Sequence, residues 1–261
     1  MHALARIVSI AVILGAAAAA RAQEAVPEVE LPMTPLPEIA TAAREGALLP
    51  STLAPRVGAT GALAFGFAGY DGARSSPIGG ATAEVRIWGP FALRGGAEYA
   101  TDRRGARPTV GGRVQFLRQE RHGLDGSLSV FYRPEGFTEP EGEIESFISL
   151  GHRFERLSVL GNLVFGQDPE GNERDGEIRL ASLCGVGRWA LGLDSRLRFA
   201  IGAQRSANAA AEPKLDLLAG PVAAAAVGPV ALFAQAGPSV LKMNRDTSVG
   251  VAALGGVGSV F

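Results

Sequence analysis

Cysteine and lysine are almost missing from this chain. Cys184 is the only cysteine, so no disulfide can form within the chain and a disulfide-stapled fold is excluded. A lone thiol in a strand most often packs as a small apolar residue. Lys214 and Lys242 are the only lysines, and the 25 basic residues are nearly balanced by 26 acidic ones. This balance excludes the basic surface that is typical of nucleic-acid-binding proteins, and we expect no nucleic-acid partner.

Long hydrophobic runs are missing too, with one exception near the N-terminus. Residues 7–20 are apolar, but this run is shorter than the ~20 residues of a membrane-spanning helix. Arg6 precedes the run, and Ala20, Arg21 and Ala22 follow it as a small-x-small cleavage site. We therefore predict a signal peptide at 1–22, export through the general secretory route, and a mature chain that starts at Gln23.

Residues 23–56 are rich in proline and show no regular alternation of apolar and polar residues. Within this segment, Pro37 and Gly46 bracket a stretch that predicts a short helix over 37–45. Two interpretations stay open for the segment. One is a periplasmic extension or an insert into a lumen, and the other is a disordered leader.

From residue 57 onward, apolar and polar residues alternate along successive stretches of about ten residues, as in strands with one apolar and one polar face. The clearest stretch is 190–203, where Leu191, Leu193 and Leu197 oppose Asp194 and Arg196. We predict an all-β chain with about twelve strands, within a range of 10–14. The predicted strands are 58–69, 80–87, 91–101, 108–118, 124–133, 143–154, 157–166, 176–187, 190–203, 214–226, 230–241 and 248–261. Strands 214–226 and 230–241 are rich in small residues, and their alternation of apolar and polar residues is poorly defined.

The connections between the predicted strands alternate in length. Long polar connections such as 70–79 and 204–213 follow odd-numbered strands, and short ones such as 88–90 follow even-numbered strands. If 88–90 is a three-residue loop, Ile87 faces Phe91 and Glu84 lies opposite Arg94 on the polar face. A strand of about eleven residues, tilted near 40°, spans roughly 28 Å, close to the apolar band of a membrane barrel. Twelve such strands close a cylinder roughly 24 Å across.

These features resemble the bacterial outer-membrane β-barrel class. The resemblance rests on the signal peptide, the strands of 57–261 and a last strand that ends in Phe261, with Val249, Val251, Ala253 and Val257 at alternate positions before it. It implies a single transmembrane antiparallel up-and-down barrel in the outer membrane of a Gram-negative bacterium. It also implies outer-membrane lipid as a partner, and the barrel-assembly machinery as the reader of Phe261. Gly255 and Ser259 depart from the apolar preference of that signal.

The polar faces of the predicted strands form the candidate functional surface, because they would line the lumen of the barrel. Charged side chains on such a wall set the ion preference of a channel. Arg179, Arg196 and Arg198, on adjacent strands, favour anions. The alternative is that the charges pair and brace a closed barrel, since the two signs are nearly equal in number. The lumen-lining candidates are Arg86, Arg94, Arg113, Arg133, Arg153, Arg179, Arg196 and Arg198, with Glu84, Glu98, Asp125, Glu143, Glu145, Glu177 and Asp194.

Catalytic and metal-binding patterns are weak in this sequence. After residue 22 the only histidines are His122 and His152, and no nucleophile motif surrounds Ser146 or Ser158. No His, Cys and Asp cluster has metal-ligand spacing, so we expect no metal and no cofactor. The leading hypothesis is a narrow passive channel for small polar or anionic solutes. A non-conducting structural or interaction barrel with a periplasmic partner is the alternative, and an outer-membrane lipid-modifying enzyme is the third.

Overall fold

The computed structural model describes residues 62–100, 105–134, 142–169, 173–186, 189–202, 213–227 and 230–260. The predicted signal peptide, the proline-rich segment 23–56 and Phe261 lie outside these residues. The described elements are β1 (Ala62–Asp71), β2 (Ser76–Trp88), β3 (Phe91–Ala100), β4 (Gly105–Leu117), α3 (Gln119–His122), β5 (Asp125–Pro134), β6 (Gly142–Arg153), β7 (Leu157–Gln167), β8 (Arg174–Val186), β9 (Trp189–Ala200), β10 (Leu215–Val227), β11 (Val230–Lys242) and β12 (Thr247–Val260). No helix in this part of the chain is long and apolar enough to cross a membrane.

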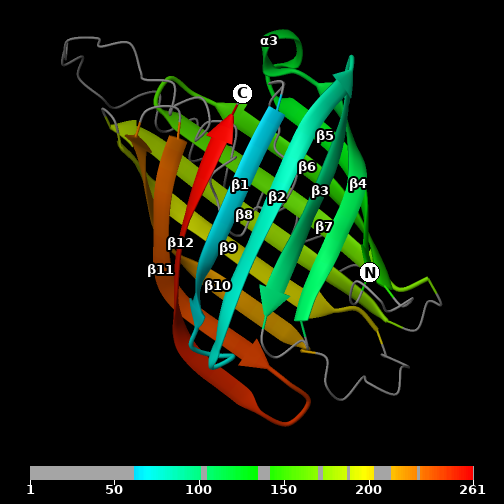
Figure 1. The fold of residues 1–261 in the computed structure, drawn as a ribbon, viewed down its shortest axis with the longest axis vertical. Coiled ribbons are helices and arrows are strands. Elements are labelled where there is room, and N and C mark those ends of the chain that lie inside the picture. The colour runs from blue at the N-terminus through cyan, green and yellow to red at the C-terminus, as the bar shows by residue number, and fades with distance from the viewer. Residues whose placement is uncertain are drawn as a thin grey trace. The chain divides into compact units, whose positions relative to one another are not determined.

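The twelve strands form one closed antiparallel barrel (Figure 1). Each strand pairs with its neighbours in the sequence, and β12 pairs with β1, with Phe65 opposite Gly258 and Tyr70 opposite Ala253, so that the sheet has no free edge. All twelve predicted strands are present, and the predicted fold class is confirmed. Closure matters because an open edge would leave a row of unpaired backbone groups.

The two ends of the barrel differ in their connections. One end, the short-turn end, carries the connections that follow even-numbered strands, such as 89–90 and 154–156. The other, the long-loop end, carries the connections that follow odd-numbered strands, such as 168–173 and 201–214. In Figure 1, α3 and the end of β12 lie at the top, which is the short-turn end.

Two local predictions about the connections are wrong. The loop predicted at 70–79 is only 72–75, because β1 and β2 continue as a hairpin in which Asp71 pairs with Ser76. The polar residues of this run look like a loop in the sequence, but Asp71 and Ser76 are buried in the barrel interior. At the next turn Trp88, not Ile87, faces Phe91, because the register shifts between Arg86 and Trp88. This bulge leaves the rest of the register unchanged, and Glu84 lies opposite Arg94 as predicted.

The single-turn helix α3, which occupies the connection between β4 and β5, was not predicted. The helix ends at Gly123, whose φ of 78° is a left-handed conformation that glycine adopts at low cost. The N–H of Gly123 donates to the backbone oxygen of Gln119.

Two glycines allow large rings to lie against the inner wall. Phe233 lies directly across from Gly256, and its ring occupies the space that a Cβ atom at Gly256 would need. Phe131 lies directly across from Gly111 in the same way, and its ring occupies the space that a Cβ atom at Gly111 would need. The Phe233 ring also stacks on Phe65, with ring centroids 5.2 Å apart. Glycine therefore sets where the interior is filled by aromatic side chains.

The outer face of the barrel is apolar. Large hydrophobic side chains are exposed near the middle of the strands, among them Leu93, Ile148, Leu163, Leu180 and Leu193. Exposed aromatic residues lie toward both ends. They are Trp88, Phe91, Phe116, Phe154 and Trp189 near the short-turn end, and Tyr70, Tyr99 and Phe165 near the long-loop end.

Candidate functional site

The interior of the barrel carries charged side chains at the predicted inward positions, and most of them are ion-paired. Glu84 on β2 is completely buried and accepts two hydrogen bonds from Arg113 on β4, from Nη2 at 2.7 Å and from Nε at 3.0 Å. Arg94 lies between them on β3, opposite Glu84, and its Nε donates to Thr82 at 2.8 Å. This group spans three neighbouring strands, since Glu84 reaches past its cross-strand neighbour.

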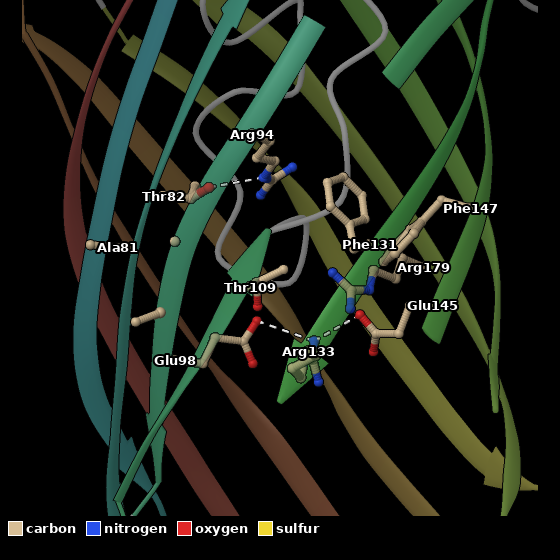
Figure 2. Close-up of a pocket in the computed structure, with 12 residues that line it drawn as sticks. Ala81, Thr82, Arg94, Glu98, Thr109, Phe131, Arg133, Glu145, Phe147 and Arg179 are labelled. Atoms are coloured by element: carbon tan, nitrogen blue, oxygen red, sulfur yellow. Dashed lines mark hydrogen bonds and ion pairs between the residues drawn. The ribbon is translucent and has the colours of Figure 1, made fainter. Parts of the chain in front are cut away.

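Two phenylalanines separate Arg94 from Arg179 along the inner wall (Figure 2). Phe131 and Phe147 meet edge to face, with ring centroids 5.3 Å apart. The guanidinium of Arg94 lies 5.6 Å from the ring centre of Phe131, and that of Arg179 lies 5.6 Å from that of Phe147. Both distances fall within the range of cation–π attraction. The two rings therefore help to hold the guanidiniums of Arg94 and Arg179 in place.

Arg133 on β5 completes the side-chain cluster of Figure 2. Its Nη2 atom lies 3.1 Å from Glu145 and 3.5 Å from Glu98. Three of the buried arginines keep a donor atom for which no acceptor is found in the part of the chain that the structure describes: Nη1 of Arg94, Nη1 of Arg113 and Nε of Arg133. A buried donor without an acceptor is costly, so these atoms favour an acceptor group that enters the lumen.

A second charged group lies on β6, β8, β9 and β10 near the long-loop end. Arg198 forms ion pairs with Asp175 and Glu143, and Arg179 forms one with Glu177. Arg196 donates to Asp216 at 2.8 Å, and Arg74, from the β1–β2 turn, donates to the same carboxylate oxygen at 2.7 Å. The turn is drawn toward the lumen because Asp71 and the Ser239 hydroxyl both accept a hydrogen bond from the Ala73 N–H.

The remaining predicted lumen residues lie apart from these groups. Arg153 contacts Asp125 at 2.9 Å and Glu120 at 3.0 Å at the short-turn end. A hydrogen bond to backbone lowers the pKa of Glu120 below its ordinary value, and Arg153 lowers it further. Arg86 is exposed and its Nε donates to the backbone oxygen of Gly89. Asp194 is buried on β9, where its backbone oxygen accepts a hydrogen bond from Gln235.

One part of the interior wall is apolar rather than charged. Leu218 and Leu254 form a buried cluster with Ala252, and Phe67 and Ile78 pack against it. These residues come from β10, β12, β1 and β2, and β11 lies between β10 and β12 in the barrel. Most of the inward charged side chains come from β3 to β9, and Arg196 on β9 lies directly across from Leu218 on β10.

Two of the cavities within the described residues lie beside these groups. The larger, about 850 Å³ including its opening to solvent, lies between the charged and the apolar walls toward the long-loop end. Its lining includes six arginines and four acidic residues: Arg74, Arg107, Arg133, Arg179, Arg196, Arg198, Asp71, Glu98, Glu177 and Asp216. The smaller, about 350 Å³, is the pocket of Figure 2. Glu98, Arg133 and Arg179 line both cavities, so the two share a wall.

Sequence reasoning missed several of these residues. Phe131 and Phe147 have the inward phase of Ser127 and Glu145 on their own strands, so the alternation alone was sufficient to find them. Asp216 and Leu218 were missed because β10 is rich in small residues and its phase is hard to read. Arg74 lies in a turn, and nothing in the sequence indicates that the turn faces the lumen.

The histidines and serines of the enzyme hypothesis lie on different surfaces. His152 is on β6 and its Nδ1 atom is 2.7 Å from the backbone oxygen of Gly123, with its ring against Phe154. Ser158 is buried on the inner face of β7. Ser146 lies six positions from His152 on the same strand, which corresponds to about 20 Å. No group of three or more His, Cys, Asp or Glu within the described strands and turns is placed to hold a metal ion.

Comparison with known proteins gives a likeness in fold only. No protein-family model matches the chain. No curated protein sequence matches it either. Among solved structures, the NanC porin is similar over 76% of this chain and 99% of its own, with a TM-score of 0.54 and 11% sequence identity. The KdgM porin (TM-score 0.48, 11% identity, 77% of this chain and 99% of its own covered) and LpxR from Salmonella typhimurium (TM-score 0.47, 10% identity, 77% and 100% covered) are more distant, with TM-scores below 0.5.

Proposed function

We propose that the protein is an outer-membrane channel that passes small anionic solutes. The observation that carries the proposal is the excess of arginine around the larger cavity, where six arginines face four acidic residues. Charged rings of this kind raise the local concentration of the oppositely charged ion and set selectivity. Arg179, Arg196 and Arg198, the group that the sequence singles out, all lie in this lining.

The outer surface supports the placement in a membrane. A continuous apolar band with aromatic residues at both ends matches a lipid-facing barrel wall, and it is far larger than the apolar patch of a typical soluble protein. The short connections then face the periplasm and the long ones the cell exterior. Under this proposal the barrel-assembly machinery reads the last strand, β12, and outer-membrane lipid surrounds the barrel.

The likeness to the NanC porin adds support from the fold, because a barrel of this kind is described there as a porin. The inner wall stays polar beyond the large cavity. Ser127, Ser129, Ser149 and Asn162 are buried on the inner face of β5, β6 and β7, and their side-chain polar atoms find no partner among the described residues. Bound water can satisfy such atoms.

A second candidate function is a closed, structural barrel, and the ion pairs favour it. Glu84 with Arg113 and Glu177 with Arg179 neutralise each other inside the wall. Paired charges brace the barrel and reduce the field that a passing ion feels.

Single-channel recording separates the two candidates. The refolded protein is inserted into a planar bilayer, and insertion is verified by protease protection of the strands. Discrete current steps support the channel. An inserted barrel that gives no current steps refutes the channel function and favours the structural role.

A further inference from the structure

The lining of the larger cavity has two chemically different parts. The charged part offers guanidinium donors, and the apolar part is the cluster of Phe67, Ile78, Leu218 and Leu254. We propose that this site binds a monocarboxylate with a compact apolar body. The inference rests on the proposed function, because it names the class of anion that the lumen takes.

The carboxylate side of the site lies where the two cavities share a wall. Arg133 lines both cavities, is 6% exposed, and its Nε atom finds no acceptor among the described residues. Arg94, in the smaller cavity, is 5% exposed and keeps Nη1 without an acceptor. Arg179 stands between them in Figure 2, with its side chain held against Phe147. A carboxylate is planar and accepts hydrogen bonds from guanidinium groups in a fixed geometry, so it satisfies donors that the protein leaves open.

The apolar side determines what is attached to the carboxylate. Leu218 and Leu254 are buried against each other, and Phe67 and Ile78 complete the apolar part of the lining of the larger cavity, where Leu218 lies directly across from Arg196 on the neighbouring strand. A hydrophilic body such as a sugar chain leaves its hydroxyls against this wall without partners. An aliphatic or aromatic body removes the wall from water.

The test is calorimetric binding to the full chain refolded into nanodiscs, with empty nanodiscs as the blank. Three probes separate the two sides of the site. Hexanoate has the charge and the apolar body, gluconate has the same charge and the same six carbons with hydroxyls, and 1-hexanol has the body without the charge. We expect hexanoate to bind at least about tenfold more tightly than either of the others.

A pair of matched variants locates the apolar side. Ile78→Thr places a hydroxyl in the wall of the cavity, and Ile148→Thr makes the same change on the outer face of the barrel. We expect Ile78→Thr to weaken hexanoate binding about three- to tenfold and to leave gluconate unchanged. Ile148→Thr leaves both affinities unchanged.

The contradicting outcomes are distinct. If gluconate binds as tightly as hexanoate, the cavity does not recognise an apolar body. If 1-hexanol binds as tightly as hexanoate, the cavity does not recognise a carboxylate. If hexanoate shows no measurable binding, the proposed site does not exist. A barrel that binds hexanoate but gives no current steps refutes the proposed channel and leaves this site standing. An anion-passing barrel that treats hexanoate and gluconate alike refutes the site and leaves the channel standing.

Discussion

The buried ion pair between Glu84 and Arg113 gives the sharpest energetic prediction. Glu84 is 0% exposed and Arg113 is 3% exposed, and two hydrogen bonds join them. The substitution Arg113→Gln leaves the Glu84 carboxylate inside the wall without the guanidinium that donates two hydrogen bonds to its Oε1 atom. Breaking a buried pair in this way costs about 3–5 kcal/mol of folding free energy. Arg94 lies directly opposite Glu84 and is the nearest replacement cation. We therefore expect a loss of folding free energy near the lower end of this range.

The assay is reversible urea unfolding of the protein from lipid vesicles, followed by the fluorescence of its tryptophans. The double variant Glu84→Gln/Arg113→Gln removes both charges, so we expect it to recover most of the stability that the single variant loses. Glu120→Gln is the control, because it breaks an exposed pair with Arg153 and such pairs contribute about 1 kcal/mol or less. A loss below about 1 kcal/mol for Arg113→Gln would refute the reasoning, as would a double variant as unstable as the single one.

Three further predictions concern the wall. Leu180→Arg, on the outer face, lowers the free energy of unfolding from vesicles by about 2–4 kcal/mol. If the Leu180→Arg variant is as stable as the Leu180→Ala variant, the outer face does not contact lipid. Gly256→Val places its Cβ atom against both the Phe233 ring and the backbone oxygen of Gly66, and we expect it to cost about 1–3 kcal/mol in the same assay, whereas Gly255→Val has ordinary room and serves as its control. The two tryptophans both lie on the outer face near the short-turn end, so lipids brominated near the headgroups quench their fluorescence more than lipids brominated at the chain ends. Equal quenching by both lipids contradicts their interfacial position.

The twelve strands were predictable because most of them contrast an apolar with a polar face. Where the contrast is strong, as on β2 and β3, even the register that sets Glu84 opposite Arg94 follows from the sequence. On β10 to β12 the inward positions are themselves apolar or small, such as Leu218 and Leu254, so both faces look alike and the inner apolar wall was not predicted.

The partners of the charged residues were harder to predict than their positions. Alternation places Glu84 on the inner face, but side-chain length and strand tilt decide that it reaches Arg113 two strands away. The same holds for Asp216, which joins Arg196 on the adjacent strand to Arg74 from a distant turn. Contacts of this kind depend on the closure of the barrel, which no local pattern encodes.

The reversal potential of single channels under a potassium chloride gradient decides whether the lumen prefers anions. We expect a shift toward the equilibrium potential of chloride, and a smaller shift for Arg196→Gln, which removes one positive charge from the larger cavity. A shift toward the equilibrium potential of potassium, or the same shift with and without Arg196, would contradict an anion-selective lumen.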